Sequence, residues 1–321
     1  MLPSIEGDLA RVEAELRSSV SSTDSFLTQI ASHLMRAGGK RVRPGFAIVC
    51  ASSLDPEATS VPLDVIRGAT AVELVHIGSL YHDDVMDEAT TRRTVRSVNS
   101  EFGNLRAILA GDFLLARASE IAASLGVEVA GLLASTIAKL CEGQIGELED
   151  AYSLTRTETS YLSSIEGKTA SLVATACRVG GLVAELPRDI IDTLTTFGHS
   201  YGMAFQVIDD ILDLVASDEQ LGKPAGNDLV EGTYTLPVIH TLRTEAGADL
   251  HHILGGPIDS TERDKARDIV RINGGIEYAL DVAVRFANDA AGSLEPLGDT
   301  PAANALRAAS DHLIGRVAEF C

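Results

Sequence analysis

The chain has 321 residues, of which 45% are hydrophobic and 22% are charged, and its formal net charge is −20. This composition is typical of a folded globular protein, and the acidic excess argues against a nucleic-acid partner, which needs a basic surface. No apolar run is long enough to span a bilayer, residues 1–15 lack the apolar stretch of a secretory signal, and the four cysteines show no paired spacing. We therefore expect a cytoplasmic protein without a stable membrane anchor.

Apolar residues recur at intervals of three and four along most of the chain, for example over 9–16, 26–34 and 108–114, which predicts helices. Proline marks helix starts near Leu63, Ile190 and Pro301. Glycine, proline and polar residues predict breaks at 37–43, 55–61, 90–98, 217–233 and 255–260. Because strand-like alternation is nearly absent, we predict a single all-α domain over residues 1–321, with about a dozen helices.

A D-D-x-x-D pattern occurs twice, each time at the end of an apolar helical segment: DDVMD at 83–87 and DDILD at 209–213. On a helix the carboxylates of each copy lie within about one turn, where their repulsion favours a bound cation. Mg²⁺ suits oxygen ligands and completes its shell with substrate phosphates and water. For one copy alone, the alternative is a solvated acidic helix end. Two copies in apolar surroundings favour a metal site instead. If the two helices face each other, six carboxylates would surround one cavity.

Basic residues accompany both acidic segments. They occur in GGKRVRP (38–44), in the pair Arg92-Arg93, at Lys168-Thr169 within an apolar helix, and in GKPAGND (222–228). Each could be an ordinary surface feature, although a buried Lys168 would need an anion beside it. Together they supply charge that suits phosphate oxygens. Carboxylates that hold metal beside cations that hold phosphate indicate an enzyme acting on a diphosphate.

In this order the segments resemble the trans-isoprenyl (polyprenyl) diphosphate synthase family. The resemblance extends over about residues 38–237 and rests on GGKRVRP (38–44), ELVHIGSLYHDDVMDEATTRR (73–93), LAGDFLLARA (109–118), EGKTASL (166–172), FQVIDDILD (205–213) and GKPAGND (222–228). It implies a bundle of antiparallel helices around a central cavity (the isoprenoid synthase type I fold), usually in a homodimer. It also implies a prenyltransferase that joins isopentenyl diphosphate to an allylic diphosphate with Mg²⁺, about three ions per active site.

The resemblance assigns roles to individual residues. The isopentenyl diphosphate would be bound by Lys40, Arg43, His76 and Arg93. The allylic diphosphate would be contacted by Arg92, Lys168, Thr169, Gln206 and Lys223. The principal metal ligands would be Asp83, Asp87 and Asp209, supported by Asp84 and Asp213. With Asp210 in the same motif, the expected catalytic set is Asp83, Asp84, Asp87, Arg92, Lys168, Asp209, Asp210 and Asp213. Outside this context His76 would be read as an ordinary core histidine.

The implied reaction is ionisation of the allylic diphosphate, attack by the isopentenyl double bond, and proton loss, with the released pyrophosphate as the base. Three residues depart from the family pattern. Thr94 and Arg96 stand where glycine and proline are common after the arginine pair, and Thr233 replaces a lysine that would contact the allylic diphosphate. The remaining cations should suffice for catalysis.

Product length should depend on the helix before the first aspartates, since the growing chain would run along it by about one turn for every 5 Å. In the family, large aromatic residues four or five positions before the first aspartate shorten the product. Here these positions are Ser79 and Gly78, with Val75 and Ala71 further down, all small or modest. We expect a product of roughly six to ten isoprene units (C30–C50).

Several alternatives stay open. A geranylgeranyl (C20) synthase remains possible, because residues on facing helices could close the tunnel. A class I terpene cyclase shares the fold and the first aspartate motif, but usually carries a different second metal site. A regulatory subunit of a heteromeric synthase would be expected to lose metal ligands, and both sets are intact here.

Overall fold

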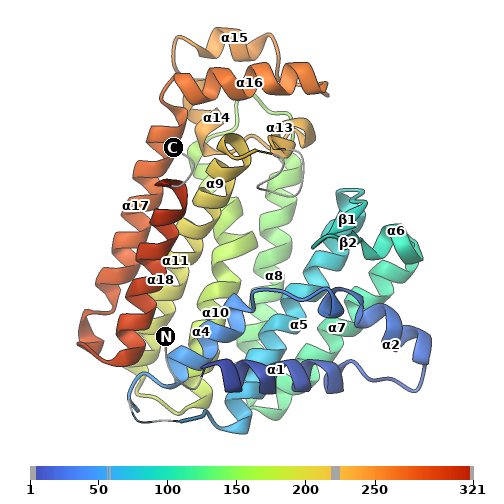
Figure 1. Cartoon of the computed structure of the whole chain (residues 1–321), viewed down its shortest axis with the longest axis vertical. Coiled ribbons are helices and arrows are strands. Elements are labelled where there is room, and N and C mark those ends of the chain that lie inside the picture. The colour runs from blue at the N-terminus through green and yellow to red at the C-terminus, as the bar shows by residue number, and fades with distance from the viewer. Residues whose placement is uncertain (1–4, 56, 58, 218–224, 319–321) are drawn as a thin grey trace. The chain divides into compact units, whose positions relative to one another are not determined.

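The computed structural model describes residues 5–55, 57, 59–217 and 225–318 (Figure 1). The first half of the chain forms α1 (Ile5–Ser19), α2 (Ser25–Ala31), α3 (His33–Arg36), α4 (Val42–Ala51), α5 (Leu63–Met86), β1 (Thr91–Arg92), β2 (Val95–Arg96), α6 (Val98–Phe102), α7 (Asn104–Ser124) and α8 (Val127–Glu149). The second half forms α9 (Glu158–Ile165), the π-helix η1 (Glu166–Ala170), α10 (Ser171–Val183), α11 (Arg188–Val215), α13 (Asn227–Glu231), α14 (Leu236–Thr241), α15 (Gly247–His251), α16 (Ser260–Ile272), α17 (Gly275–Ser293), the 3₁₀ turn η2 (Glu295–Leu297) and α18 (Pro301–Ala318).

The prediction of an all-α protein is confirmed, and the predicted helix starts agree with α5, α11 and α18. Two details differ. Within the described residues, short helices of four to seven residues, such as α3 and α15, raise the number above the predicted dozen. The predicted break at 90–98 contains an antiparallel hairpin that pairs Thr91 with Arg96 and Arg92 with Val95. Strands of two residues leave no alternating pattern for sequence analysis to detect.

The described residues divide into two compact units. Unit 1 takes its residues from 1–137, 172–195 and 294–306, and unit 2 from 138–171, 196–293 and 307–321. In unit 1, α1, α4 and α7 pack against α5. Residues 68–75 of α5 are all buried, so this helix has no solvent-facing side there and forms the middle of the unit. In unit 2, α14 packs against α9, α16 and α17, and α16 also contacts α13.

Close helix contacts in both units depend on glycine. In unit 1 a Cβ on Gly180 of α10 would lie 2.2 Å from the carbonyl oxygen of Ala47 in α4. The same two helices bring Cys50 and Cys177 together as buried free thiols, although 127 residues separate them (177 − 50). Burial raises the pKa of the Cys50 thiol well above its usual value, and the hydrogen bond with Cys177 adds to the shift.

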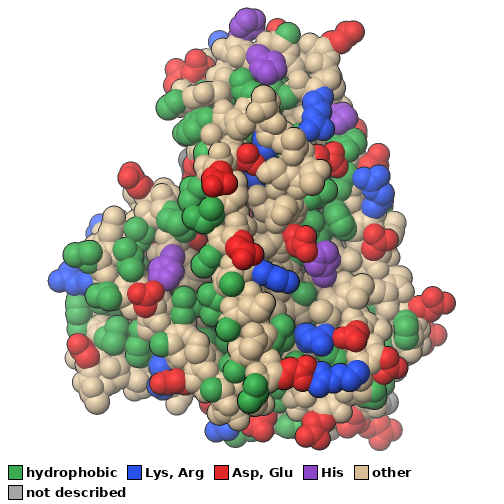
Figure 2. All heavy atoms as spheres, turned by 180° about the vertical axis from the view of Figure 1, so that it is seen from behind, with side chains coloured by type: hydrophobic (Ala, Val, Ile, Leu, Met, Phe, Trp, Pro, Cys, Tyr) green, Lys and Arg blue, Asp and Glu red, His purple; other side chains and the backbone are tan. Residues whose placement is uncertain are grey.

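No helix within the described ranges is long and apolar enough to cross a membrane. Acidic side chains are spread over the face drawn in Figure 2, with lysine and arginine side chains among them rather than gathered into a basic area. This distribution agrees with the net charge of −20.

Candidate active site

The first aspartate motif occupies the last turn of α5 in unit 1. Asp83 is partly exposed and Asp87, which caps the helix, is exposed, whereas Asp84 is fully buried. Arg92 from strand β1 donates from Nε to Oδ1 of Asp84 at 2.7 Å. Burial raises the pKa of Asp84, and the charge of Arg92 opposes the rise. The middle carboxylate of the motif is thus held inside the protein by the first arginine of the predicted pair.

The hairpin also fixes the second arginine of the pair. Arg93 donates from Nη1 to the carbonyl oxygens of Gly38 and Leu34, which ties the hairpin to the GGKRVRP segment. Thr94, where the family commonly has glycine, adopts φ +67° in the left-handed region that glycine favours. This backbone conformation gives the physical reason for the family's glycine and shows that threonine can occupy the position.

Arg41, in the GGKRVRP segment, is buried in the protein rather than exposed on its surface. It donates to Glu13 of α1 and, at 2.9 Å, to Glu73 of α5, and its side chain is only 5% exposed. Sequence analysis counted Arg41 among the cations available to phosphate, and the structure instead assigns it to a buried ion pair. Glu73 was missed as its partner, although a charged residue in the apolar segment before His76 was a signal. Gly39 fits beside this cluster because a Cβ there would lie 2.9 Å from Arg41 and Arg93.

The predicted isopentenyl diphosphate ligands lie around this cluster. Lys40 is exposed, and Arg43 is partly exposed with a buried Nε that has no hydrogen-bond partner among the described residues. His76, one turn after Glu73, has its pKa lowered well below the usual value by burial and by the charges of Arg43, Arg93, Arg41 and Arg92. The imidazole is therefore neutral near pH 7 and stands among cations, as expected beside an anion-binding site.

The second aspartate motif lies near the end of α11 in unit 2 and repeats the arrangement of the first. Asp209 is exposed and Asp210 is buried. Asp210 accepts from the Tyr161 hydroxyl at 2.6 Å and from Gln206 Nε2 at 2.8 Å, and Gln206 accepts from Thr169 at 2.7 Å. Burial raises the pKa of Asp210 to about 7, against the effect of the two hydrogen bonds. The structure thus connects three predicted site residues and adds Tyr161, which no motif had indicated.

Two further predicted site residues, Lys168 and Asp213, also belong to unit 2. Lys168 is about one third exposed and donates to Glu147 of α8 at 2.5 Å, so the anion predicted for it is present in the protein itself. Asp213 accepts from the backbone N–H of Asp228 at 3.3 Å. Thr233 follows Gly232, and its N–H donates to the carbonyl of Asp228 at 2.8 Å. Lys223 lies outside the described residues.

The carboxylates fit a magnesium ion that keeps most of its ligands from substrate and water. Among the described residues no group of three or more acidic, histidine or cysteine side chains could hold a metal ion without help. Mg²⁺ is usually bound by one or two carboxylates together with phosphate oxygens and water. In both motifs the hydrogen-bonded second aspartate leaves the first aspartate nearer to solvent, where such a ligand set can assemble.

Known proteins are similar to this chain in sequence and in fold. The sequence model of the Polyprenyl synthetase family matches residues 24–272. The nonaprenyl diphosphate synthase of Mycobacterium tuberculosis is 37% identical over 317 residues, which cover 97% of this chain and 93% of the relative. Heptaprenyl diphosphate synthase component 2 of Geobacillus stearothermophilus is 38% identical over 306 residues, covering 94% of each chain.

A solved structure gives the same result for the fold. The crystal structure of geranylgeranyl pyrophosphate synthase from Corynebacterium glutamicum, complexed with calcium and isoprenyl diphosphate, is 38% identical, has a TM-score of 0.85 and covers 98% of this chain and 96% of its own. The resemblance found in the sequence motifs is therefore confirmed at the level of family, fold and enzyme class. The chain belongs to the polyprenyl synthetase family and is an all-α prenyltransferase that makes a polyprenyl diphosphate.

Proposed function

We propose that this chain condenses isopentenyl diphosphate with an allylic diphosphate in the presence of Mg²⁺ and makes an all-trans product of roughly six to ten isoprene units. The observation that carries the proposal is the repeated arrangement of the two aspartate motifs. In each, the second aspartate is buried and hydrogen bonded, to Arg92 in one and to Tyr161 and Gln206 in the other. The same local structure built twice from unrelated partners supports a role for each motif in binding metal and diphosphate.

The protein's own residues would act mainly by binding and orienting charge. Arg92, Lys168, Thr169 and Gln206 would contact the allylic diphosphate, and Lys168 would exchange Glu147 for a phosphate oxygen. Lys40, Arg43, His76 and Arg93 would hold the isopentenyl diphosphate. Bound Mg²⁺ supplies Lewis-acid stabilisation of the departing pyrophosphate; the expected ligands are Asp83, Asp87 and Asp209. Water must be kept out, because it would quench the allylic cation.

The condensation breaks one C–O bond and one C–H bond and forms one C–C bond and one O–H bond. The allylic C–O bond breaks and its electron pair leaves with pyrophosphate. The double bond of isopentenyl diphosphate then attacks the allylic carbon and forms the new C–C bond. Loss of one proton to the released pyrophosphate restores a double bond, so the chain need not supply a base.

The product length is tested at Ser79. A Cβ on Gly78 would lie 3.2 Å from the carbonyl of Gly111 in α7, so a large residue there would displace α7 and leave the result ambiguous. Ser79 is partly exposed and next in sequence, and Val75 is buried one turn below. We expect Ser79→Phe to shorten the product, whereas Ser119→Phe on the exposed side of α7 leaves it unchanged. An identical product ladder in the Ser79 variant would contradict the assignment of the tunnel.

We infer a homodimer and one functional domain for this chain. The second half of α8 exposes apolar side chains at helical spacing, with Ile145 56% and Leu148 50% exposed and Cys141 on the same side. Such a stripe supports burial against another helix. The family match over 24–272 includes residues of both units, which supports a single functional domain. We place the enzyme in the cytoplasm.

The test of the function is an assay with purified protein, Mg²⁺, labelled isopentenyl diphosphate and a panel of allylic starters, with products dephosphorylated and sized. Ladders that reach six or more units support the proposal, and a stop at four units assigns a geranylgeranyl synthase instead. One relative is named as component 2 of a heptaprenyl diphosphate synthase. The chain is therefore assayed alone, so that a requirement for a partner subunit would show as a lack of activity. No incorporation with any starter would favour an obligate partner subunit or a cyclase.

A further inference from the structure

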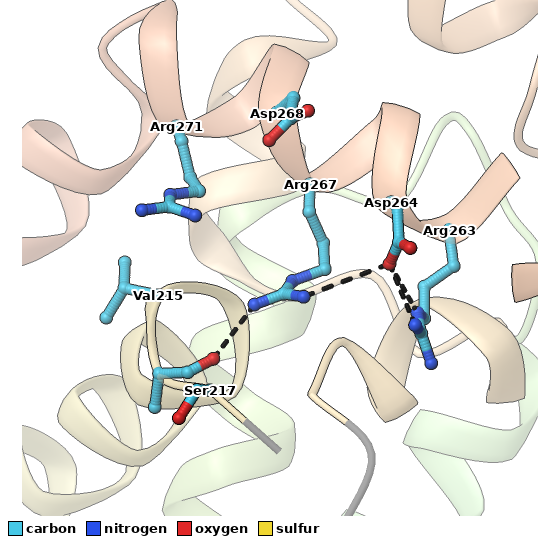
Figure 3. Close-up of a pocket in the computed structure, with 8 residues that line it drawn as sticks. Val215, Ser217, Arg263, Asp264, Arg267, Asp268 and Arg271 are labelled. Atoms are coloured by element: carbon cyan, nitrogen blue, oxygen red, sulfur yellow. Dashed lines mark hydrogen bonds and ion pairs between the residues drawn. The ribbon is translucent and has the colours of Figure 1, made fainter. Parts of the chain in front are cut away.

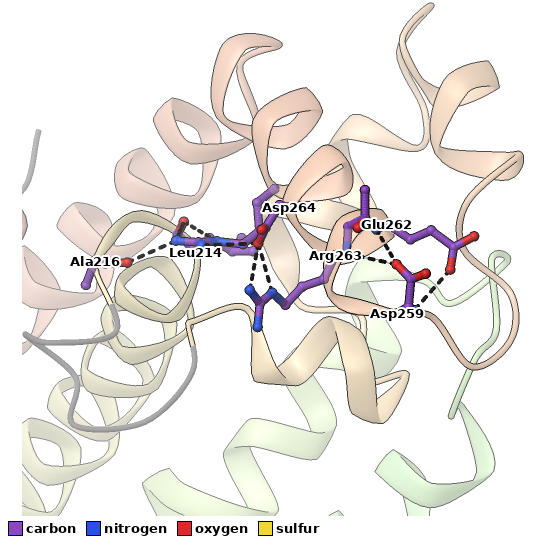
Figure 4. A network of polar contacts seen from close by, with 8 residues as sticks. Leu214, Ala216, Asp259, Glu262, Arg263 and Asp264 are labelled. Carbon is purple, nitrogen blue, oxygen red and sulfur yellow. Dashed lines mark hydrogen bonds and ion pairs between the residues drawn. The ribbon is translucent and has the colours of Figure 1, made fainter.

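Arg267 of α16 caps the C-terminal end of α11, the helix that carries the second aspartate motif. Its Nε and Nη2 donate to the carbonyl oxygen of Leu214 at 3.1 and 2.9 Å, and Nη2 also donates to the carbonyl of Ala216 at 2.9 Å. Figure 4 shows these carbonyls facing α16. The last carbonyls of a helix have no partner within the helix, and a cation there also interacts favourably with the helix dipole. Arg267 both donates hydrogen bonds to these carbonyls and places a positive charge at the negative end of the helix dipole.

The stem of the same side chain also lies against Gly226, just before α13. Gly226 adopts φ +73°, and a Cβ on it would lie 2.6 Å from Cδ of Arg267, so only glycine fits against this arginine. The N–H of Gly226 in turn donates to the carbonyl of Asp213 at 2.7 Å. Arg267 therefore contacts Leu214 and Ala216 at the end of α11 and Gly226 just before α13. Asp213 is next to both contacts, because it precedes Leu214 and its carbonyl accepts from Gly226.

The helix that carries Arg267, α16, is itself held in place by a capped start and by buried side chains. Its start is fixed by a capping box in which Asp259 accepts from the backbone of Thr261 and Glu262 while Glu262 accepts from the N–H of Asp259 (Figure 4). Ala266 and Val270, which flank Arg267 on the helix, are buried. Both cap and core therefore hold the helix that presents Arg267, whose side chain is only 14% exposed.

Two neighbouring arginines line the same pocket, which has a volume of about 500 Å³, but differ in their contacts (Figure 3). Arg263 is paired with Asp264 through two hydrogen bonds of 2.9 and 2.8 Å. Arg271, one turn after Arg267, is exposed and makes no hydrogen bond in the described part of the chain. Arg271 therefore provides a control with the same chemistry on the same helix face.

We infer that Arg267 is a positioning residue for the second aspartate motif, which it orders by capping α11 one residue after Asp213. Asp209 lies one turn earlier on the same helix, so fraying of the last turn would reach the carboxylates that the proposed function assigns to metal and diphosphate binding. The inference rests on that proposed function for its catalytic consequence. Its structural part, the ordering of the end of α11, stands independently.

The test compares Arg267→Ala with Arg267→Lys and Arg271→Ala in two measurements. The first is amide hydrogen exchange of residues 209–217 in the metal-free protein, where the Ala216 N–H reports the last turn through its bond to Leu212 at 2.9 Å. We expect roughly tenfold faster exchange in Arg267→Ala. The second is the Mg²⁺ concentration for half-maximal activity, expected to rise about tenfold with KM for the allylic diphosphate while KM for isopentenyl diphosphate stays unchanged.

The outcomes separate the possibilities. Arg267→Lys keeps a charge near the carbonyls and should recover part of both effects, and Arg271→Ala should resemble the wild type. Loss of active protein without a change in Mg²⁺ dependence would mean a purely structural role and overturn the inference, as would unchanged exchange in Arg267→Ala. If the wild type incorporates no isopentenyl diphosphate, the proposed function fails, and the exchange experiment still decides whether Arg267 orders α11.

Discussion

Replacing Tyr161 with phenylalanine tests the hydrogen bonds that hold the buried aspartate of α11. The hydroxyl donates to Oδ2 of Asp210 at 2.6 Å, and the two side chains lie inside unit 2, with 1% and 5% of their surfaces exposed. Phenylalanine keeps the ring, which lies beneath the guanidinium of Arg156 at 5.6 Å, and removes only the donor. The substitution therefore leaves packing in place and isolates one hydrogen bond.

The expected loss follows from the charge of the acceptor. A hydrogen bond contributes about 1 kcal/mol between neutral groups and about 1.5–3 kcal/mol when one partner is charged. Burial raises the pKa of Asp210 to about 7, so near neutral pH the carboxyl is ionised in part of the molecules. We expect Tyr161→Phe to lower the free energy of unfolding by about 1.5–2 kcal/mol. The pKa of Asp210 should rise further, because the lost bond favoured the ionised form.

The measurement is urea unfolding followed by circular dichroism, with a metal chelator present. Tyr278→Phe is the matched control: its hydroxyl donates to Glu158 at 2.9 Å in a partly exposed position, where we expect a loss of about 0.5 kcal/mol. Equal losses in the two variants would refute the reasoning, because they would mean that the buried acceptor at Asp210 is satisfied without Tyr161.

Two further predictions concern unfolding stability. The lowered pKa of His76 means that, as pH falls through 6.5, the unfolded chain takes up a proton that the folded protein does not. Between about pH 7.5 and about pH 5.5 the wild type should therefore lose up to about 1.4 kcal/mol more than His76→Asn, as measured by urea unfolding at both pH values; parallel losses would exclude the shift. In α8, Gly143→Ala should cost about 2 kcal/mol, because its Cβ would lie 2.6 Å from the backbone nitrogen of Lys168. Gly131→Ala, with nothing within 4 Å of its added Cβ, should be neutral or stabilising. Thermal unfolding of both variants measures the difference, and equal Tm values would contradict the close contact.

Sequence analysis predicted the long helices well, because their signals are local. The proline before Leu63 and the apolar spacing that follows determine α5 without reference to the rest of the chain. The hairpin at residues 91–96 was missed, because its pairing is held by backbone bonds and by Arg92 and Arg93, which contact other segments. Short strands of this kind depend on tertiary contacts that leave no periodic trace.

The candidate site was predicted by motif, and its supporting contacts were not. The position of both aspartate motifs could be read directly, since each ends an apolar helix. The partners of the buried aspartates could not, because Tyr161 is 49 residues from Asp210 and belongs to no motif. Arg41 shows the opposite error: a basic residue in a glycine-rich turn was read as available charge, while burial and Glu73 make it part of the interior. The sequence shows which residues are charged, whereas the fold determines whether a charged side chain is exposed to a ligand or paired inside the protein.

The π-helix between α9 and α10 determines how tolerant this region is to a change in length. A uniform α-helix turns about 100° per residue, so the eight steps from Tyr161 to Thr169 would leave the two side chains about 80° apart. Both nevertheless reach α11, at Asp210 and Gln206, because the wider turn over Glu166–Ala170 takes up the difference. Deleting one residue from this turn would leave seven steps of a regular helix, which place the two side chains only about 20° apart, so both contacts would be kept. The π-helix therefore accommodates one residue more than a regular helix needs between Tyr161 and Thr169, and the segment can be one residue shorter without separating the two contacts.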